Sequence, residues 1–397
     1  MFKITKADEL ITKELIEDLS YTYGTPLYLY FEKIIRERTE SVKNVFSEVN
    51  IFPTFACKAN NNPRLLNIIS SEGFGMDVVT LGEYHASKLA GVPDEKIVWN
   101  GNGKSLEDMS LLAKVGYINI DSVEEFERWK ESSIQSNASF FLRINPNVDP
   151  KTHPHISTGL KKNKFGIPIE YVEKVLKDSK YRNMISGFHV HIGSQITDVE
   201  PFREAIYQVV KLSHRYGFSK INIGGGWGIN YCGTELDLEE YRKVVTPLLK
   251  DFEEVVLELG RYIIAPASVL ILKVEYVKQT QDKVFVVVDG GMNMLIRPVL
   301  YNAHHNLIVL EPTTEKVVAD IVGPLCESGD VIATDREIWL PRVGSYILVE
   351  NVGAYGYSMT SNYNTTSRPA EVLITAKNEA RLIRRRETFD DLFRLIV

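Results

Sequence analysis

The sequence predicts an α/β protein with an N-terminal (β/α)8 TIM-like barrel followed by a mainly β domain of barrel or sandwich type. Two observations predict this fold class. From about residue 50 onward, short apolar runs alternate with amphipathic stretches, and such runs are typical of parallel strands covered on both faces. After about residue 265 the helical spacing disappears, and strand-like runs follow one another between Gly, Pro, Asp and Asn residues.

Eight apolar runs within about 210 residues match a closed barrel better than an open sheet. The predicted barrel strands cover residues 53–57, 77–80, 97–100, 117–120, 139–144, 187–192, 220–223 and 255–258. Between them, apolar residues spaced three and four apart predict helices. These helices cover residues 64–71, 83–90, 106–115, 123–132, 171–178, 201–216 and 238–251.

The later runs predict the strands of the second domain. They cover residues 268–279, 283–289, 307–310, 316–322, 331–333, 346–349 and 370–374, and residues 27–30 are a further strand candidate. We expect the barrel to occupy residues 30–275 and the β domain to combine residues 1–29 with residues 276–397.

Composition excludes several classes of protein. The 397 residues are 44% hydrophobic with 17 Phe and 19 Tyr, which is too apolar for a disordered chain. No stretch reaches the ~18 apolar residues of a membrane span, and the charged start is not a secretory signal. A net charge of -6 argues against nucleic acid as the main partner. Cys57, Cys232 and Cys326 form neither a disulfide framework nor a zinc site, so we expect a cytoplasmic protein.

Polar residues follow several predicted strands, at the face where barrel active sites lie. Lys58 directly follows the first strand and is either a surface cation or an amine suited to form a Schiff base. His189 and His191 share one face of the sixth strand. They are core histidines or half of a metal site, and the metal is the weaker interpretation because a third ligand is missing.

The last two predicted strands end in residues that suit a phosphate and an aromatic ring. The glycines at 224–226 are either a tight turn or a phosphate cradle, and they fit no dinucleotide motif and no P-loop. Glu258 could hold a protonated ring nitrogen and Arg261 a phosphate or carboxylate, or the two could form a surface ion pair. Together with Lys58 and the imidazoles, these groups match the needs of pyridoxal 5′-phosphate (PLP).

Seven motifs resemble those of the barrel-type PLP-dependent decarboxylases and occur in the order found in that family. They are FACKAN, HVHIGSQ, GGGWGI, ELGR, GMNMLIRPVLY, CESGD and GAYGYSMTSNYN. The resemblance implies PLP as the cofactor, no metal, and an amino acid as the substrate. It also implies a homodimer with shared active sites, in which the β domain contributes to the active site and to the dimer interface.

The resemblance also implies roles for individual residues. Lys58 would carry PLP, His191 would stack on its ring, and Glu258 would keep the ring nitrogen protonated. The other cofactor-binding positions would be Asp77, Ser194, Gly225, Gly226, Gly260, Arg261 and Tyr355. The substrate-binding positions would be Arg261, Arg297, Tyr301, Glu327 and Tyr355. Cys326 of the partner subunit would be the acid that reprotonates the α-carbon. Three positions depart from the family pattern without removing a functional group, namely Trp227, Leu259 and Gly290.

The implied reaction is decarboxylation of meso-2,6-diaminopimelate to L-lysine and CO2, the last step of lysine biosynthesis. Arg261 and Arg297 suit the distal carboxylate and Glu327 suits the distal ammonium, although Arg297 could also be structural. One alternative is a decarboxylase of the same fold acting on ornithine, arginine or an acyl-linked amino acid. Another is a non-catalytic PLP-binding protein or an alanine racemase-like enzyme, against which Glu258 argues because racemases place an arginine at the ring nitrogen.

Overall fold

The computed structural model describes residues 11–150, 158–160, 163–177 and 182–397. Its contacts divide the chain into two compact units. The barrel unit comprises Arg36–Ile229 and Thr234–Ile263, and the β unit comprises the segment up to Ile35 together with Asn230–Gly233 and Ile264–Val397. In the part of the chain that the structure describes, no helix is long and apolar enough to cross a membrane.

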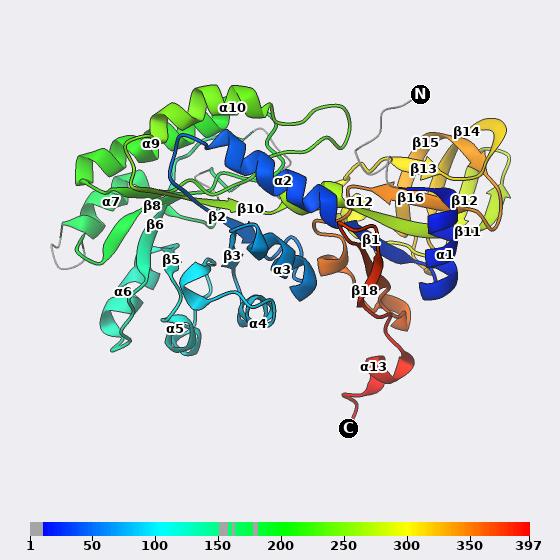
Figure 1. The fold of residues 1–397 in the computed structure, drawn as a ribbon, viewed down its shortest axis with the longest axis horizontal. Helices are drawn as coiled ribbons and strands as arrows, with labels where there is room; N and C mark the ends of the chain where they lie inside the picture. Colours follow the sequence, from blue (N-terminus) through cyan, green and yellow to red (C-terminus); the bar gives the residue numbers. More distant parts are fainter. Residues whose placement is uncertain (1–10, 151–157, 161–162, 178–181) are drawn as a thin grey trace. The chain divides into compact units, whose positions relative to one another are not determined.

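Eight parallel strands of the described barrel unit close into a ring (Figure 1). They are β2 (Ile51–Ala56), β3 (Gly75–Val78), β4 (Ile97–Trp99), β5 (Tyr117–Ile120), β6 (Ser139–Asn145), β8 (Ile185–Val190), β9 (Lys220–Asn222) and β10 (Glu254–Leu259). The pairing of β5 with β6 closes the ring, and the short β7 (Ile167–Pro168) lies beside β6. All eight predicted barrel strands are confirmed.

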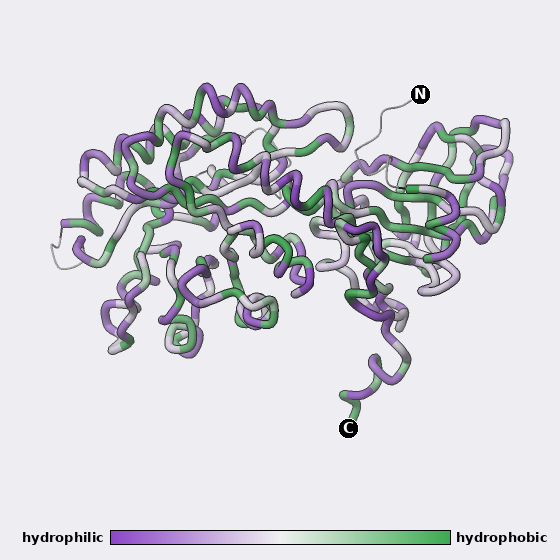
Figure 2. The backbone as a smooth tube through the Cα atoms, viewed as in Figure 1, coloured by the Kyte–Doolittle hydropathy of each residue, from purple (hydrophilic) through white to green (hydrophobic). Residues whose placement is uncertain are grey.

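Helices cover the outside of this ring (Figure 1), and hydrophobic and hydrophilic residues alternate along them (Figure 2). They are α2 (Glu32–Val45), α3 (Pro63–Ser71), α4 (Leu81–Leu89), α5 (Leu106–Leu112), α6 (Val123–Glu131), α7 (Ile169–Leu176), α9 (Glu200–Tyr216), α10 (Leu238–Val245) and α11 (Arg261–Ile264), with 3-10 turns at η2 (Asp94–Lys96) and η4 (Thr246–Leu249). Helix α2 was not predicted from the sequence, because its apolar spacing is interrupted where its middle turn buries Thr39. The predicted helix at 171–178 extends to residue 178, which lies outside the described residues.

The inside of the barrel has an apolar layer and, nearer the C-terminal strand ends, a polar layer. Val98, Phe141 and Val256 form a fully buried cluster, and Phe52 and Tyr117 pack against it. Residues two positions apart on a strand face the same side, so the next inward position is polar on several strands. These buried polar residues are Asn100, Asn119, Arg143 and Glu258.

The β unit contains a nine-stranded mixed sheet in its described residues. Its strands are β1 (Leu27–Phe31), β11 (Ser268–Gln279), β12 (Val284–Val288), β13 (Leu307–Val309), β14 (Pro312–Val322), β15 (Val331–Pro341), β16 (Tyr346–Glu350), β17 (Ala370–Ile374) and β18 (Ala380–Arg384). The fully buried β1 lies between β11, with which it is antiparallel, and β17, with which it is parallel. The eight strands predicted for this region are confirmed, but β18 was missed and β15 is longer than predicted.

Short helices accompany this sheet. They are α1 (Lys13–Tyr23), α12 (Arg297–Tyr301), α13 (Phe389–Phe393), η5 (Ala265–Ala267), η6 (Tyr357–Met359) and η7 (Tyr363–Thr365).

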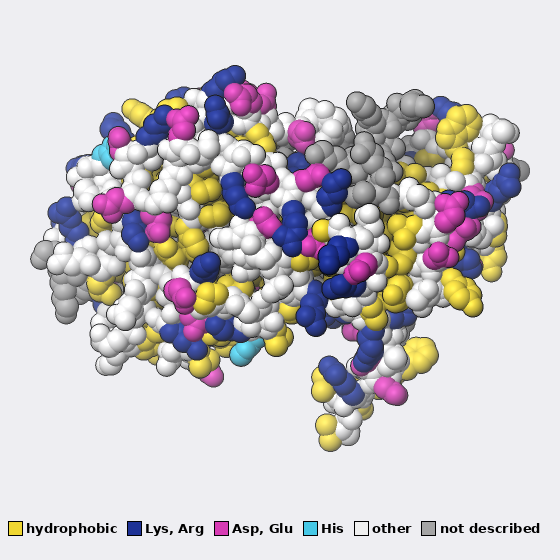
Figure 3. Space-filling view, in the orientation of Figure 1, with side chains coloured by type: hydrophobic (Ala, Val, Ile, Leu, Met, Phe, Trp, Pro, Cys, Tyr) yellow, Lys and Arg dark blue, Asp and Glu magenta, His cyan; other side chains and the backbone are white. Residues whose placement is uncertain are grey.

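Gly290 shows how tightly the unit is packed, because an added Cβ would lie 2.6 Å from Pro26 Cγ and 2.9 Å from Leu272 Cδ2. On the face shown in Figure 3, basic and acidic side chains are interspersed.

Candidate active site

Glu258 is buried in the polar layer of the barrel, where three side-chain amides converge on one of its oxygens. The Nδ2 groups of Asn100, Asn119 and Asn222 donate to Glu258 Oε1 at 2.9, 2.6 and 2.7 Å. These asparagines come from the ends of β4, β5 and β9, so the ring of strands brings them together. Hydrogen bonds donated to a carboxylate stabilise its charged form.

His189 lies at the other carboxylate oxygen, with its Nε2 3.2 Å from Glu258 Oε2. Burial by itself would raise the pKa of Glu258, but His189, His191 and the amide of Asn100 lower it, and the net pKa lies well below its ordinary value. Burial also lowers the pKa of His189. The barrel interior therefore holds Glu258 as a buried, ionised carboxylate.

Asp77 on β3 is the protonated counterpart of Glu258. Burial and the negative charge of Glu258 raise the pKa of Asp77 to about 8, against an opposing effect of Lys58. Asn100 links the two acids, because its Nδ2 also donates to Asp77 Oδ1 at 2.6 Å. The site thus contains two neighbouring acids of which one keeps its proton at neutral pH.

Lys58 is exposed on the turn that directly follows β2. That turn is fixed to β3, because Cys57 N donates to Asp77 O at 2.9 Å. Burial, followed by the positive charge of Lys58, holds the pKa of His191 well below its ordinary value, and the same charge opposes the rise in the pKa of Asp77. The amine, the second acid and the imidazole therefore meet at the C-terminal ends of the strands.

The glycine run of residues 224–226 lies where the backbone at the ends of β8, β9 and β10 is closely packed. Side chains would not fit there. A Cβ on Gly225 would lie 1.9 Å from Glu258 O, and Gly226 has a φ of +105° in the left-handed region. Gly225 N donates to His191 Nδ1 at 3.2 Å. The adjacent Trp227 packs against the rings of Phe46, Tyr241 and Tyr262, which anchors the run to the outer helices.

Arg261 and Ser194 add a cation and a hydroxyl beside the glycine run. Arg261 is buried at the start of α11, and its Nη2 donates to Ser194 Oγ at 3.1 Å. Gly260 precedes it, and a Cβ there would lie 3.0 Å from Ala59 Cβ next to Lys58. Its small size allows the end of β10 to approach the turn that carries the lysine.

The structure brings together nine of the predicted site residues in the barrel unit. They are Lys58, Asp77, His191, Ser194, Gly225, Gly226, Glu258, Gly260 and Arg261. The other five predicted residues lie in the β unit, namely Arg297, Tyr301, Cys326, Glu327 and Tyr355. The contacts above are therefore those of the barrel residues alone.

In the β unit, Arg297 and Tyr301 lie on α12, and Cys326 and Glu327 are exposed on the turn between β14 and β15. The buried Asp330 anchors this turn by accepting hydrogen bonds from Met292 N at 2.6 Å and Leu325 N at 2.7 Å. The anchored turn therefore presents the thiol and the carboxylate at the surface of the unit.

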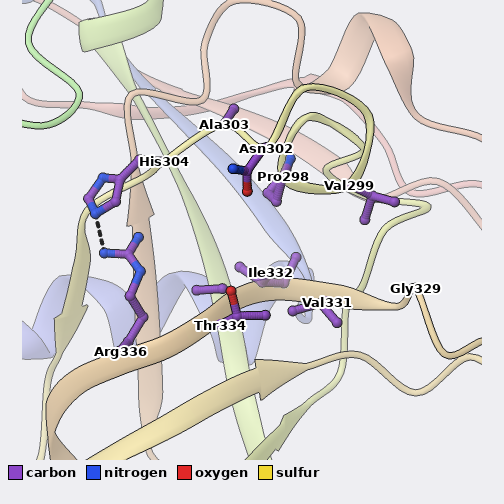
Figure 4. A pocket seen from close by; sticks show the side chains of 11 residues that line it. Pro298, Val299, Asn302, Ala303, His304, Gly329, Val331, Ile332, Thr334 and Arg336 are labelled. Atoms are coloured by element: carbon purple, nitrogen blue, oxygen red, sulfur yellow. Dashed lines mark hydrogen bonds between the residues drawn. The ribbon is translucent and has the colours of Figure 1, made fainter.

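A separate cavity of about 440 Å³ in the β unit contains none of the predicted site residues (Figure 4). Its lining residues are Pro298, Val299, Asn302, Ala303, His304, Gly329, Val331, Ile332, Ala333, Thr334 and Arg336. One guanidinium nitrogen of Arg336 hydrogen-bonds to Nε2 of His304, as Figure 4 shows. In the described part of the chain, no cluster of three or more His, Cys, Asp or Glu could hold a metal ion.

The residues that surround Glu258 were not predicted from the sequence. No role is predicted for Asn100, Asn119 or Asn222, and His189 is a candidate without an assigned role. The available signal was a single polar residue inside an otherwise apolar strand, as in INI at 118–120. Arg143 was missed too, although it contacts Asp121 at 3.2 Å and donates to His191 O at 3.4 Å.

The chain is similar to known proteins over nearly its whole length. A family model described as "Pyridoxal-dependent decarboxylase, pyridoxal binding domain" matches residues 32–265. A diaminopimelate decarboxylase from Aquifex aeolicus (strain VF5) is 41% identical over 392 residues, covering 94% of this chain and 92% of that protein. One from Methanocaldococcus jannaschii is 40% identical with the same coverage. The crystal structure of diaminopimelate decarboxylase from Helicobacter pylori complexed with L-lysine has a TM-score of 0.87 at 35% identity, covering 96% of this chain and 98% of that one.

Proposed function

The chain belongs to the pyridoxal-dependent decarboxylases, and from this premise we propose that it converts meso-2,6-diaminopimelate to L-lysine and CO2, the last step of lysine biosynthesis. The observation that carries the proposal is the 41% identity to a diaminopimelate decarboxylase across nearly the full length of both chains. The Helicobacter pylori relative with L-lysine bound supports the same product.

The groups at the barrel strand ends fit PLP by their chemistry. The exposed amine of Lys58 would attach the cofactor, and His191 would pack against its ring. Gly225 and Gly226, with Ser194, Gly260 and Arg261 of the barrel unit and Tyr355 of the β unit, would surround the phosphate. When bound, PLP supplies an electron-accepting ring for the charge left when CO2 departs.

Glu258 contributes a fixed negative charge at the ring nitrogen. Three amides and His189 hold it ionised and prevent its side chain from rotating away. A charge oriented before the reaction requires no rearrangement as the reaction proceeds, which makes it effective in catalysis. Asp77, protonated beside it, adds a neutral donor near Lys58 rather than a competing negative charge.

Arg261 and residues of the β unit would recognise the substrate. Arg261 and Arg297 would bind the distal carboxylate, and Glu327 the distal ammonium, with Tyr301 and Tyr355 alongside. Cys326 would donate the proton that replaces the lost carboxylate, since a thiol with a suitable pKa serves as a general acid.

We propose a homodimer in which Cys326 and Glu327 complete the active site of the partner subunit. In this arrangement the β domain of residues 1–29 and 276–397 contributes to the active site and to the interface. The exposure of Cys326 and Glu327 supports it. The apolar side chains of Phe389, Phe393 and Leu395, which are more than half exposed, also support association. Three free cysteines support a reducing, cytoplasmic location.

A substrate panel tests the proposed reaction. The purified protein with PLP is incubated with meso-diaminopimelate, L-lysine and L-ornithine while CO2 release is followed. We expect CO2 from diaminopimelate alone. Release from ornithine or lysine instead would assign the chain to a decarboxylase of simple diamino acids.

Borohydride reduction tests the attachment of the cofactor. We expect a yellow protein whose reduced cofactor is found on Lys58 by peptide mapping, and Lys58→Ala should give no labelled peptide and lose nearly all activity. A label on any other lysine would contradict the assigned site.

A further inference from the structure

Arg297 is buried in the β unit, and its guanidinium group is held by two neighbouring rings. Its Nη1 lies 2.7 Å from His305 Nε2, and its Cζ lies 4.7 Å from the centre of the Tyr231 ring. Tyr231 and His305 contact each other edge to face, with ring centres 5.2 Å apart. The direction of this arginine therefore depends on how the two rings are held.

The partners of His305 determine its tautomer. Its Nδ1 lies 2.7 Å from the backbone oxygen of Glu350, and a carbonyl oxygen only accepts hydrogen bonds, so Nδ1 carries the hydrogen. A guanidinium group only donates, so Nε2 must be the acceptor for Arg297. His305 is therefore a neutral ring. Its Nδ1 donates to the backbone carbonyl of Glu350, and its Nε2 accepts from Arg297.

The carbonyl that anchors His305 belongs to the last residue of β16, a strand that pairs with both β11 and β13. Glu350 ends β16 and pairs with Val269 of β11, and its N–H donates to Asn306 O at 3.0 Å. His305 itself is 1% exposed. The sheet thus fixes the imidazole, and the imidazole fixes one edge of the guanidinium.

We propose that His305 is a positioning residue that orients Arg297 for the distal carboxylate of the substrate. This rests on the proposed function, because only a substrate with a second carboxylate needs that orientation. A carboxylate binds a guanidinium best through two parallel hydrogen bonds, which depend on the direction of the guanidinium plane. His305 holds that plane through Nη1 of Arg297 and would act on the substrate only through this arginine.

The neighbouring His304 provides a matched control. It has the same bonding pattern, because its Nδ1 lies 2.9 Å from Tyr231 O and its Nε2 accepts from Arg336 (Figure 4). Its arginine lines the cavity of Figure 4 and also donates to the backbone oxygen of His305, but it is not among the residues proposed to bind the substrate. His304→Asn removes the acceptor for Arg336 but keeps a donor for Tyr231 O, so the Tyr231 ring beside Arg297 stays held. Arg336 keeps its second hydrogen bond, to His305 O.

Two variants of His305 distinguish the effect of the hydrogen-bond acceptor at Nε2 from the effect of the imidazole ring as a whole. Asn reaches the position of Nδ1 only and removes the acceptor for Arg297, whereas Gln places an oxygen near the position of Nε2. For His305→Asn we expect KM for meso-diaminopimelate to rise about tenfold with kcat within about twofold, since one hydrogen bond to a charged group is lost. For His305→Gln and for His304→Asn we expect KM within about threefold of wild type. The visible spectrum of bound PLP should stay unchanged in all variants.

The outcomes distinguish this role from the proposed function. Wild-type protein that releases no CO2 from diaminopimelate overturns the function and this role with it. An active wild type whose Asn variant keeps its KM overturns the role of His305 alone. If the Asn variant does not fold, as judged by its thermal unfolding, the Gln variant decides: a normal KM supports an acceptor role, and a tenfold higher KM in a folded protein overturns it.

Discussion

The two units of this protein place their acidic site residues in opposite environments, one buried and one exposed. Glu258 of the barrel unit is buried and surrounded by three amides and a histidine of its own unit. Glu327 of the β unit is exposed on an anchored turn next to Cys326. The ionisation of Glu258 is thus determined by the fold itself, whereas Glu327 can act only on a molecule that comes against its turn.

The largest effect is expected when the buried carboxylate is neutralised. Glu258→Gln should keep PLP bound but lower turnover about 10²- to 10³-fold, because a neutral amide no longer stabilises the protonated ring nitrogen. The measurement combines the visible spectrum of the bound cofactor with the rate of CO2 release. Glu254→Gln, at the partly exposed start of the same strand, should leave turnover nearly unchanged. Near-normal turnover in Glu258→Gln would detach this residue from the ring nitrogen.

A smaller and different effect is expected at the exposed carboxylate. Glu327→Ala should raise KM for diaminopimelate by roughly 30-fold, which corresponds to about 2 kcal/mol, because the distal ammonium loses its partner. The affinity for PLP, measured by titration of the protein with the cofactor, should not change. Ser328→Ala on the same turn serves as the control. An unchanged KM in Glu327→Ala would reopen the question of the substrate.

Mixing two inactive variants tests whether the Lys58 and the Cys326 of one active site come from different subunits. Lys58→Ala and Cys326→Ala should each be nearly inactive, and they are unfolded together and refolded. Random pairing makes half of the dimers heterodimers, each with one intact site, so about a quarter of all sites should recover. Differential tags verify that heterodimers form. If they form and the mixture stays inactive, Lys58 and Cys326 act within one chain.

The pH dependence of stability tests the protonation of the second buried acid, Asp77. The pKa of Asp77 is raised from 3.8 to about 8 in the folded chain, so between these values the folded state binds more protons than the unfolded state. Its contribution to stability is therefore full below pH 3.8 and declines as the pH rises toward 8, by at most ~1.4 kcal/mol per pH unit. Asp77→Asn should flatten this decline. Urea unfolding of the cofactor-free protein at pH 5, 6 and 7 measures it, and identical slopes for both proteins would contradict a protonated Asp77.

The sequence by itself determined which segments form the strands, because side-chain periodicity reports directly which faces are buried. All eight barrel strands and eight of the nine strands in the β unit were predicted from that pattern. The motif order also identified the family and located the amine, the glycine run and Arg261 at strand ends. These inferences need only local spacing or linear order, and both are present in the chain before it folds.

The tertiary structure alone decided how the polar groups act on one another. Asn100, Asn119 and Asn222 are far apart in sequence and meet at Glu258 only because β5 pairs with β6 and closes the ring. That closure buries Asp77 and Glu258 together, which is why one acid is ionised and the other protonated. In the same way, His305 reaches Arg297 because β16 fixes the carbonyl of Glu350. Hydrogen bonding and burial depend on distances between strands, and no spacing within the sequence encodes those distances.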